Sequence, residues 1–76
     1  MILRSRLPEL MEIAGVNQKT LAVETGLSPA TVSKIYHGRF SQIDSHTIEV
    51  LLKRFRLTKL DDLFEVIWDN DELPNP

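Results

Sequence analysis

The chain contains no cysteine, only three glycines and four prolines among 76 residues, and a single tryptophan. Without cysteine there is neither a disulfide framework nor a thiolate zinc site. The scarcity of glycine and proline, with 42% hydrophobic residues, favours one small helix-rich domain over a disordered chain. No apolar run approaches the ~18 residues of a membrane span, and the N-terminus lacks a secretion signal. We therefore expect a cytoplasmic protein with one domain, residues 1–76, and no membrane partner.

The formal net charge of −2 hides an uneven distribution of charge along the chain. Residues 1–60 hold all nine Lys and Arg but five Asp and Glu, a net charge of +4. Residues 61–76 hold six acidic side chains and no basic one, a net charge of −6. A basic body with an acidic tail fits a protein that presents one face to phosphate and keeps another away from it. The tail is otherwise explained by solubility alone.

Residues 17–38 carry the most informative pattern, two short helices that meet at a tight turn. Asn17 is a good N-cap for the first helix, and Gly26 ends it because glycine accepts the left-handed conformation of a helix C-terminus. Ser28 is the next N-cap, Pro29 occupies the first helical position, and Gly38 is the second stop. Two helices separated by a turn of this length form the helix-turn-helix pattern of DNA-binding proteins.

The second of these helices has two chemically different faces. Spacings of three and four place one apolar set on the face that should be buried: Val32, Ile35 and Tyr36. The opposite face is small, polar and basic, and it comprises Ala30, Ser33, Lys34 and His37. Because these side chains are short or flexible, the helix can enter a DNA major groove without steric obstruction.

Three further helices are expected around this motif. The first starts after Ser5 and ends at Gly15, with an apolar stripe of Leu7, Leu10, Met11 and Ala14. A fourth begins at Asp44 or Ser45 and buries Ile48, Leu51, Leu52 and Phe55. Thr58 and Asp61 resemble a capping box for a short fifth helix, which would turn inward the apolar residues Leu60, Leu63, Phe64 and Ile67. The predicted fold class is therefore all-α with five helices over residues 5–67, followed by an acidic tail over residues 68–76.

The two ends of this helical core leave one alternative open. Residues 1–4 precede the first helix and have the character of an extended arm. Residues 65–68 (Glu-Val-Ile-Trp) are rich in types that favour strands, so they either pair with residues 2–4 as a two-stranded ribbon or continue the fifth helix.

Over residues 4–67 the chain resembles the Cro/C1-type, or phage-repressor-like (XRE), helix-turn-helix regulators. The matching residues are Leu10-Met11, Gly15, Asn17-Gln18, Leu21-Ala22, Gly26-Leu27-Ser28, Thr31-Val32-Ser33, Ile35, Gly38, Thr47, Leu51 and Asp62-Leu63-Phe64. The segment Tyr36-His37-Gly38-Arg39, followed by Ile43-Asp44, is similar to a subgroup of short single-domain members. Many other relatives carry an acidic residue and an asparagine before that glycine, so this chain departs from them locally.

The resemblance implies a five-helix DNA-binding domain that acts as a homodimer on a two-fold symmetric operator. The third helix would lie in the major groove, with base-facing positions at Pro29, Ala30, Ser33 and Lys34. Backbone contacts would come from the start of the second helix at Gln18 and from the loop carrying Arg39, Phe40 and Gln42.

The chemistry of the side chains refines these assignments. Lys34 can donate to a guanine edge or to a phosphate, and Pro29 and Ala30 can only pack against a thymine methyl group. Lys19 shares with Gln18 a positively polarised helix N-terminus that favours a phosphate. Thr31 binds a phosphate or a base edge, or else returns its hydroxyl to a carbonyl group one turn back.

The surface for a second copy is expected around Val66, Ile67 and Trp68, with Trp68 either a dimer anchor or a lid over the core. His37 and His46 have no partners at metal-ligand spacing, and Ser28 and Asp44 are explained as helix caps, so neither a metal site, a cofactor nor an enzyme is expected. A sequence-specific transcriptional repressor is the preferred interpretation. The alternatives are a DNA-binding antitoxin that grips its toxin through the acidic tail, and an interaction module without DNA binding.

Overall fold

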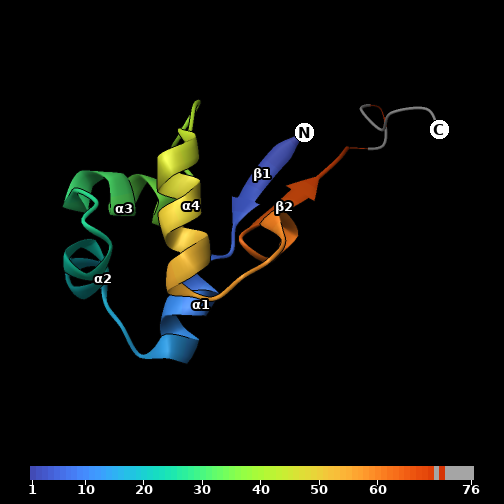
Figure 1. Ribbon diagram of the computed structural model, residues 1–76. Helices are drawn as coiled ribbons and strands as arrows, with labels where there is room; N and C mark the ends of the chain where they lie inside the picture. Colours follow the sequence, from blue (N-terminus) through green and yellow to red (C-terminus); the bar gives the residue numbers. More distant parts are fainter. Residues whose placement is uncertain (70, 72–76) are drawn as a thin grey trace.

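The computed structural model describes residues 1–69 and 71, which fold into four α-helices and a two-stranded antiparallel sheet (Figure 1). The elements in chain order are β1 (Ile2–Ser5), α1 (Leu7–Ala14), α2 (Gln18–Thr25), α3 (Pro29–His37), α4 (Ser45–Arg54), the 3-10 turn η1 (Leu60–Asp62) and β2 (Phe64–Ile67). Among these elements, no helix is long and apolar enough to cross a membrane. The molecule is elongated, 42 × 22 × 21 Å, with the helices at one end and the sheet at the other.

The core forms where the apolar faces of the four helices meet the base of the sheet. The buried apolar residues are Leu7, Met11, Leu21, Ala22, Val32, Ile35, Leu51, Leu63 and Phe64. Full burial of one leucine or valine side chain contributes about 1.5–3 kcal/mol, so this small cluster supplies most of the stability available to the domain. The inward positions predicted for Val32, Ile35, Leu51 and Leu63 are confirmed. Tyr36 is only half-buried, at the edge of the core.

The start of α1 differs by one residue from the sequence prediction. The helix begins at Leu7 rather than directly after Ser5, because Arg6 occupies the cap position. Ser5 is buried, and its hydroxyl accepts a hydrogen bond from the backbone N–H of Leu7 at 3.2 Å. Ala14 was predicted to join the apolar stripe, but it is exposed. The helix ends at Gly15, as predicted, and its last turn therefore reaches beyond the core.

The ends of the chain meet in the two-stranded sheet, which we call the ribbon (Ile2–Ser5 and Phe64–Ile67). Its register pairs Ile2 with Ile67 and Ser5 with Phe64, so of the two alternatives for the C-terminal segment the strand is the one adopted. Trp68 lies just beyond the last pair. Ion pairs brace the ribbon, since Glu65 accepts from Arg4 at 3.1 Å and lies 3.5 Å from Arg6.

The predicted fifth helix is wrong. In its place the chain makes the single turn η1, in which the N–H of Leu63 donates to the carbonyl of Leu60 at 2.9 Å, and then enters β2. The backbone groups of residues 64–67 find their partners in β1, which removes the need for further helical turns. The short turn leaves the side chain of Leu60 51% exposed instead of inward, whereas Leu63 and Phe64 are buried as predicted. Ile67 was also expected inward, but it is exposed because it pairs with Ile2 at the outer end of the ribbon. Most of the acidic tail, residues 70 and 72–76, lies outside the described residues, and so does the partner contact predicted for it.

Candidate nucleic-acid interface

The starts of α2 and α3 are each fixed by a side-chain cap, and the turn between the two helices is closed by Gly26 and Ser28. The Asn17 side chain accepts from the N–H of Thr20 at 2.8 Å, and Ser28 accepts from the N–H of Thr31 at 3.1 Å. Gly26 has a φ of 75°, a conformation that glycine adopts without strain. These caps fix where each helix begins and therefore how α3 is presented to solvent. The caps and stops predicted for both helices are confirmed.

Thr25 is a contributor to this turn that the sequence did not reveal. Its hydroxyl donates to the carbonyl of Leu21 at 2.7 Å and accepts from the N–H of Leu27 at 3.3 Å. One side chain thus joins the last turn of α2 to the first residue after the glycine. A threonine directly before a helix-ending glycine is the only sequence signal for this contact, and it is a weak one.

The outer surface of α3 is open. Pro29, Ala30 and Lys34 are exposed and Ser33 is half-buried, while Val32 and Ile35 on the opposite face are 0% and 3% exposed. In Figure 1, α3 lies beside α2, and its C-terminal end approaches β1. An α-helix with its side chains is about 10–12 Å in diameter, so α3 can enter a major groove about 12 Å wide.

Four of the predicted contact residues line one hollow of about 190 Å³ between α3, the following loop and the start of α4: Thr31, Lys34, Phe40 and Gln42. The Phe40 ring stacks edge-on against Phe64 with centroids 5.5 Å apart, so this side chain anchors the loop to the core. The Thr31 hydroxyl lies 2.8 Å from that of Ser28, rather than on a carbonyl group one turn back. Gln18 lies elsewhere, half-buried in a hollow beside α1.

Asp44 is the one acidic side chain that lines this hollow. Its carboxylate is hydrogen-bonded to the first turn of α4, the helix that Asp44 precedes. Its carboxylate accepts from the N–H of Thr47 at 2.8 Å and so caps α4. Hydrogen bonds from the Thr47 hydroxyl and then from the Thr47 amide hold the pKa of Asp44 below its ordinary value. The carboxylate therefore stays ionised but is directed at the helix N-terminus, whose dipole it complements.

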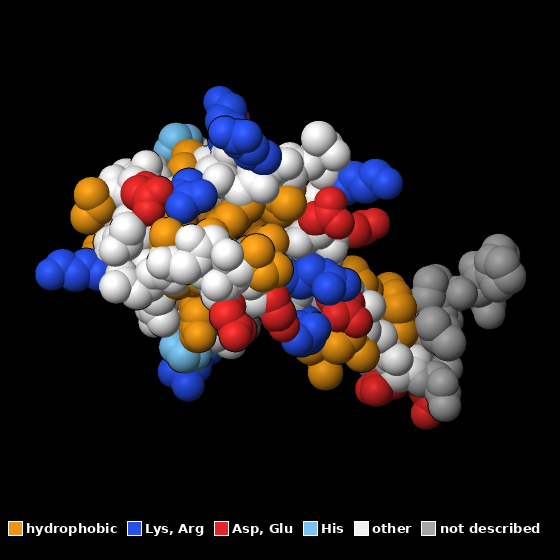
Figure 2. All heavy atoms as spheres, turned by 90° about the horizontal axis from the view of Figure 1, so that it is seen from below, with side chains coloured by type: hydrophobic (Ala, Val, Ile, Leu, Met, Phe, Trp, Pro, Cys, Tyr) orange, Lys and Arg blue, Asp and Glu red, His pale blue; other side chains and the backbone are white. Residues whose placement is uncertain are grey.

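The basic side chains differ in whether they form an ion pair with a carboxylate. Four of them are bound to carboxylates: Arg4, Arg6, Lys53 and Arg54. Three that flank the open surface of α3, Lys19, Lys34 and Arg39, are exposed and form no ion pair with any described residue. In the view of Figure 2, most acidic side chains lie toward the side of the molecule that carries the ribbon. Unpaired cations beside an open helix are available for phosphates.

A helix-turn-helix with an uncovered second helix, flanked by free cations, defines a class of DNA-binding domain. Among the described residues, no three His, Asp or Glu side chains gather in a way that could hold a metal ion. The family model for the Cro/C1-type helix-turn-helix DNA-binding domain matches residues 6–69. The chain belongs to this family. No curated protein and no solved structure matches it.

Proposed function

We propose that this protein is a sequence-specific transcriptional repressor that binds a two-fold symmetric operator as a homodimer. The observation that carries the proposal is the open outer surface of α3, whose exposed residues include Ala30 and Lys34. No described segment packs over that surface, and the cations beside it have no ion-pair partners among the described residues. Binding within a promoter is sufficient for repression, because a bound protein excludes the polymerase from the same DNA.

The bases are read by the first two turns of α3. Lys34 donates to O6 or N7 of guanine, Ser33 hydrogen-bonds a base edge, and Pro29 and Ala30 pack against thymine methyl groups. Pro29 and Ala30 have no polar side-chain atom, so Lys34 provides most of the discrimination. A good base contact is worth about 1–3 kcal/mol.

The DNA backbone is held on both sides of α3. Lys19 and Gln18 lie at the positively polarised N-terminus of α2 and bind one phosphate. Arg39, Gln42 and the loop backbone that Phe40 anchors bind another, with the Thr31 hydroxyl beside them. These contacts set the register of α3 on the duplex but carry no sequence information.

Two copies are needed because one α3 reads only a few base pairs. The exposed apolar side chains of the ribbon offer a surface for the second copy: Ile2 (61% exposed), Val66 (47%), Ile67 (39%) and, just beyond β2, Trp68 (41%). Aromatic and aliphatic side chains of this kind are enriched at the centres of protein interfaces. The surface lies away from α2, and only the C-terminal end of α3 borders β1, so pairing through the ribbon leaves the base-facing residues of both copies of α3 open.

Selection of bound sequences from a random DNA pool tests the proposal most directly. The expected product is a palindrome whose half-sites are centred about one helical turn, ~34 Å, apart. A parallel selection with Lys34→Ala should lose preference at one position in each half-site, whereas Lys59→Ala, an exposed lysine outside the interface, should not. Recovery of no enriched sequence, or of the same sequence with Lys34→Ala, refutes the base-reading role. Binding that is absent at low salt favours an interaction module instead.

A further inference from the structure

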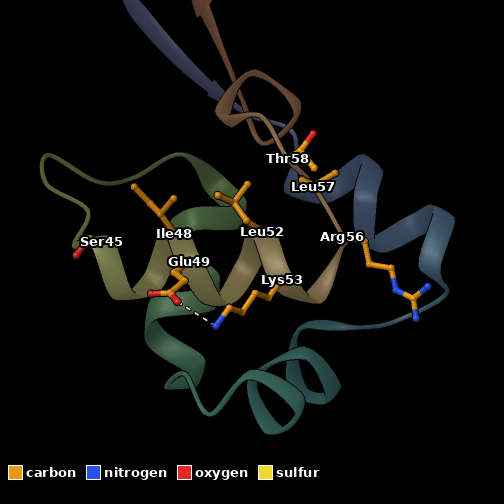
Figure 3. Close-up of a pocket in the computed structure, with 8 residues that line it drawn as sticks. All are labelled: Ser45, Ile48, Glu49, Leu52, Lys53, Arg56, Leu57 and Thr58. Atoms are coloured by element: carbon orange, nitrogen blue, oxygen red, sulfur yellow. Dashed lines mark ion pairs between the residues drawn. The ribbon is translucent and has the colours of Figure 1, made fainter.

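The outer side of α4 carries an apolar groove of about 620 Å³ that DNA binding does not use. Figure 3 shows Ile48 and Leu52 projecting from one side of α4, with Leu57 in the segment that follows the helix. Ile48, Leu52 and Leu57 are half-buried. Leu52 and Leu57 also pack against the core, so each covers the core with part of its surface and leaves the rest in the groove. An apolar floor of three aliphatic side chains suits one large hydrophobic side chain.

Two cations stand at the rim of this groove, Lys53 and Arg56. The Lys53 ammonium lies 3.0 Å from a Glu49 carboxylate oxygen, but both side chains are more than half exposed, and an ion pair of that kind is weak and easily exchanged. Arg56 forms no ion pair with any residue from 1 to 69 or with residue 71. The groove therefore combines a hydrophobic floor with positive charge at its edge.

The backbone of Arg56 gives an independent reason to look for a role of its side chain. Arg56 has a φ of 55°, and it is the only described residue other than glycine with a positive φ. The three other helix ends with this conformation use glycine, at Gly15, Gly26 and Gly38. A strained backbone conformation at a residue other than glycine, in a position where glycine would fit without strain, is typical of a functional site.

The complementary chemistry occurs in this same chain, just beyond β2. Trp68 is 41% exposed and is the only tryptophan of the protein. It is followed by Asp69 and Asp71, which are exposed and form no ion pair with other described residues. The indole ring can fill an apolar groove, and the two acids that follow it carry the charge opposite to that of the cations at the rim of the groove.

From this complementarity we infer that Trp68 of one copy inserts into the α4 groove of a second copy, where Asp69 and Asp71 pair with Arg56 and Lys53. The second copy is the occupant because β2, which Trp68 directly follows, runs away from α4 of its own chain (Figure 1). The exchange is reciprocal, so it closes a two-fold symmetric dimer and gives no open chain. The inference rests on the proposed homodimer and specifies the surface that holds it.

Charge exchange between the two halves of the contact tests this inference in the full-length protein. Arg56→Glu should weaken dimerisation about tenfold or more, because attraction becomes repulsion at two equivalent contacts. The double variant Asp69→Lys/Asp71→Lys should weaken it for the same reason. The matched control is Lys59→Glu, which makes the same charge change in the loop three residues after Arg56 but outside the groove. Dissociation constants come from sedimentation, and the emission of the single tryptophan reports burial of Trp68 on association.

An equimolar mixture of Arg56→Glu chains and Asp69→Lys/Asp71→Lys chains gives the decisive measurement. In a mixed dimer, the groove that carries the Arg56→Glu substitution receives the introduced lysines and the unchanged groove receives the native acids. Affinity should therefore rise well above that of either variant alone, but it should stay below the wild-type level because Lys53 then faces an introduced lysine. The Lys59→Glu chain mixed with the same partner should not restore it. No restoration, or an Arg56→Glu dimer as stable as the Lys59→Glu dimer, overturns the inference. If the wild-type protein itself stays monomeric with operator DNA, the proposed homodimer fails, and that result is distinct from the others.

Discussion

The salt dependence of operator binding is the most direct quantitative consequence of the charge distribution around α3. Each bound phosphate releases counterions and adds about −0.9 to the slope of log K against log salt concentration. Each copy offers Lys19, Lys34 and Arg39 as free cations. If Lys34 binds a base, a dimer makes four phosphate contacts and a slope of about −3.6; if Lys34 binds phosphate, it makes six and a slope of about −5.4.

These slopes mean that affinity should fall by about 10²- to 10³-fold between 50 and 200 mM salt. Arg39→Gln removes two contacts per dimer and should make the slope shallower by about 1.8. Fluorescence anisotropy of a labelled operator across a salt series measures both values. Lys59→Gln is the matched control, because Lys59 is exposed and equally free of described ion pairs but lies away from α3. A slope near zero, or equal slopes for the two variants, would refute the assignment of the interface.

Three further predictions concern stability and are read by chemical or thermal denaturation. Ser28→Ala removes the cap of α3 and should destabilise the fold by about 1 kcal/mol, with a matching loss of DNA affinity since α3 is then less ordered. Arg56→Gly should raise stability by about 0.5–1 kcal/mol, because it removes the strain at a φ of 55° at the expense of some chain entropy. Because the folded-state pKa of Asp44 lies below its ordinary value of 3.8, the stabilisation by this carboxylate is complete above that pH and is lost as the pH falls through the folded-state pKa. Asp44→Asn should therefore flatten the acid limb of a stability–pH curve, and an unchanged limb contradicts the capping role.

The helix-turn-helix could be predicted from sequence because its signals are local. Asn17, Gly26 and Ser28 act on backbone groups within four residues of themselves, so each cap can be read without knowledge of the fold. The prediction of a fifth helix was wrong because the conformation of that segment depends on a partner far away in the sequence. Thr58 and Asp61 form a local helix signal, but the segment that follows pairs with β1, almost sixty residues earlier in the chain, and that partner decides its conformation.

The candidate site likewise has features that could be predicted from local sequence and features that depend on long-range contacts. The exposed face of α3 follows from helical periodicity, so Ala30 and Lys34 could be placed outward in advance. The hollow that joins Lys34 to Gln42 could not, because the loop between them is held by the contact of Phe40 with Phe64. The pairing of Arg54 with Glu24 across α4 and α2, at 2.7 Å, is also invisible in the sequence, although it decides which cations remain free for DNA.

The length of the molecule constrains how two copies can share one operator. The chain extends 42 Å along its long axis, with α2 and the first turns of α3 toward one end and the ribbon at the other. Two copies joined end to end through their ribbons would hold their α3 helices farther apart than the ~34 Å between adjacent faces of the major groove. Insertion of Trp68 into the α4 groove instead draws each ribbon along the body of its neighbour, so the long axes overlap and the α3 helices approach each other. Selected operators with half-sites one helical turn apart would support the overlapping arrangement, whereas half-sites two turns apart would favour the end-to-end one.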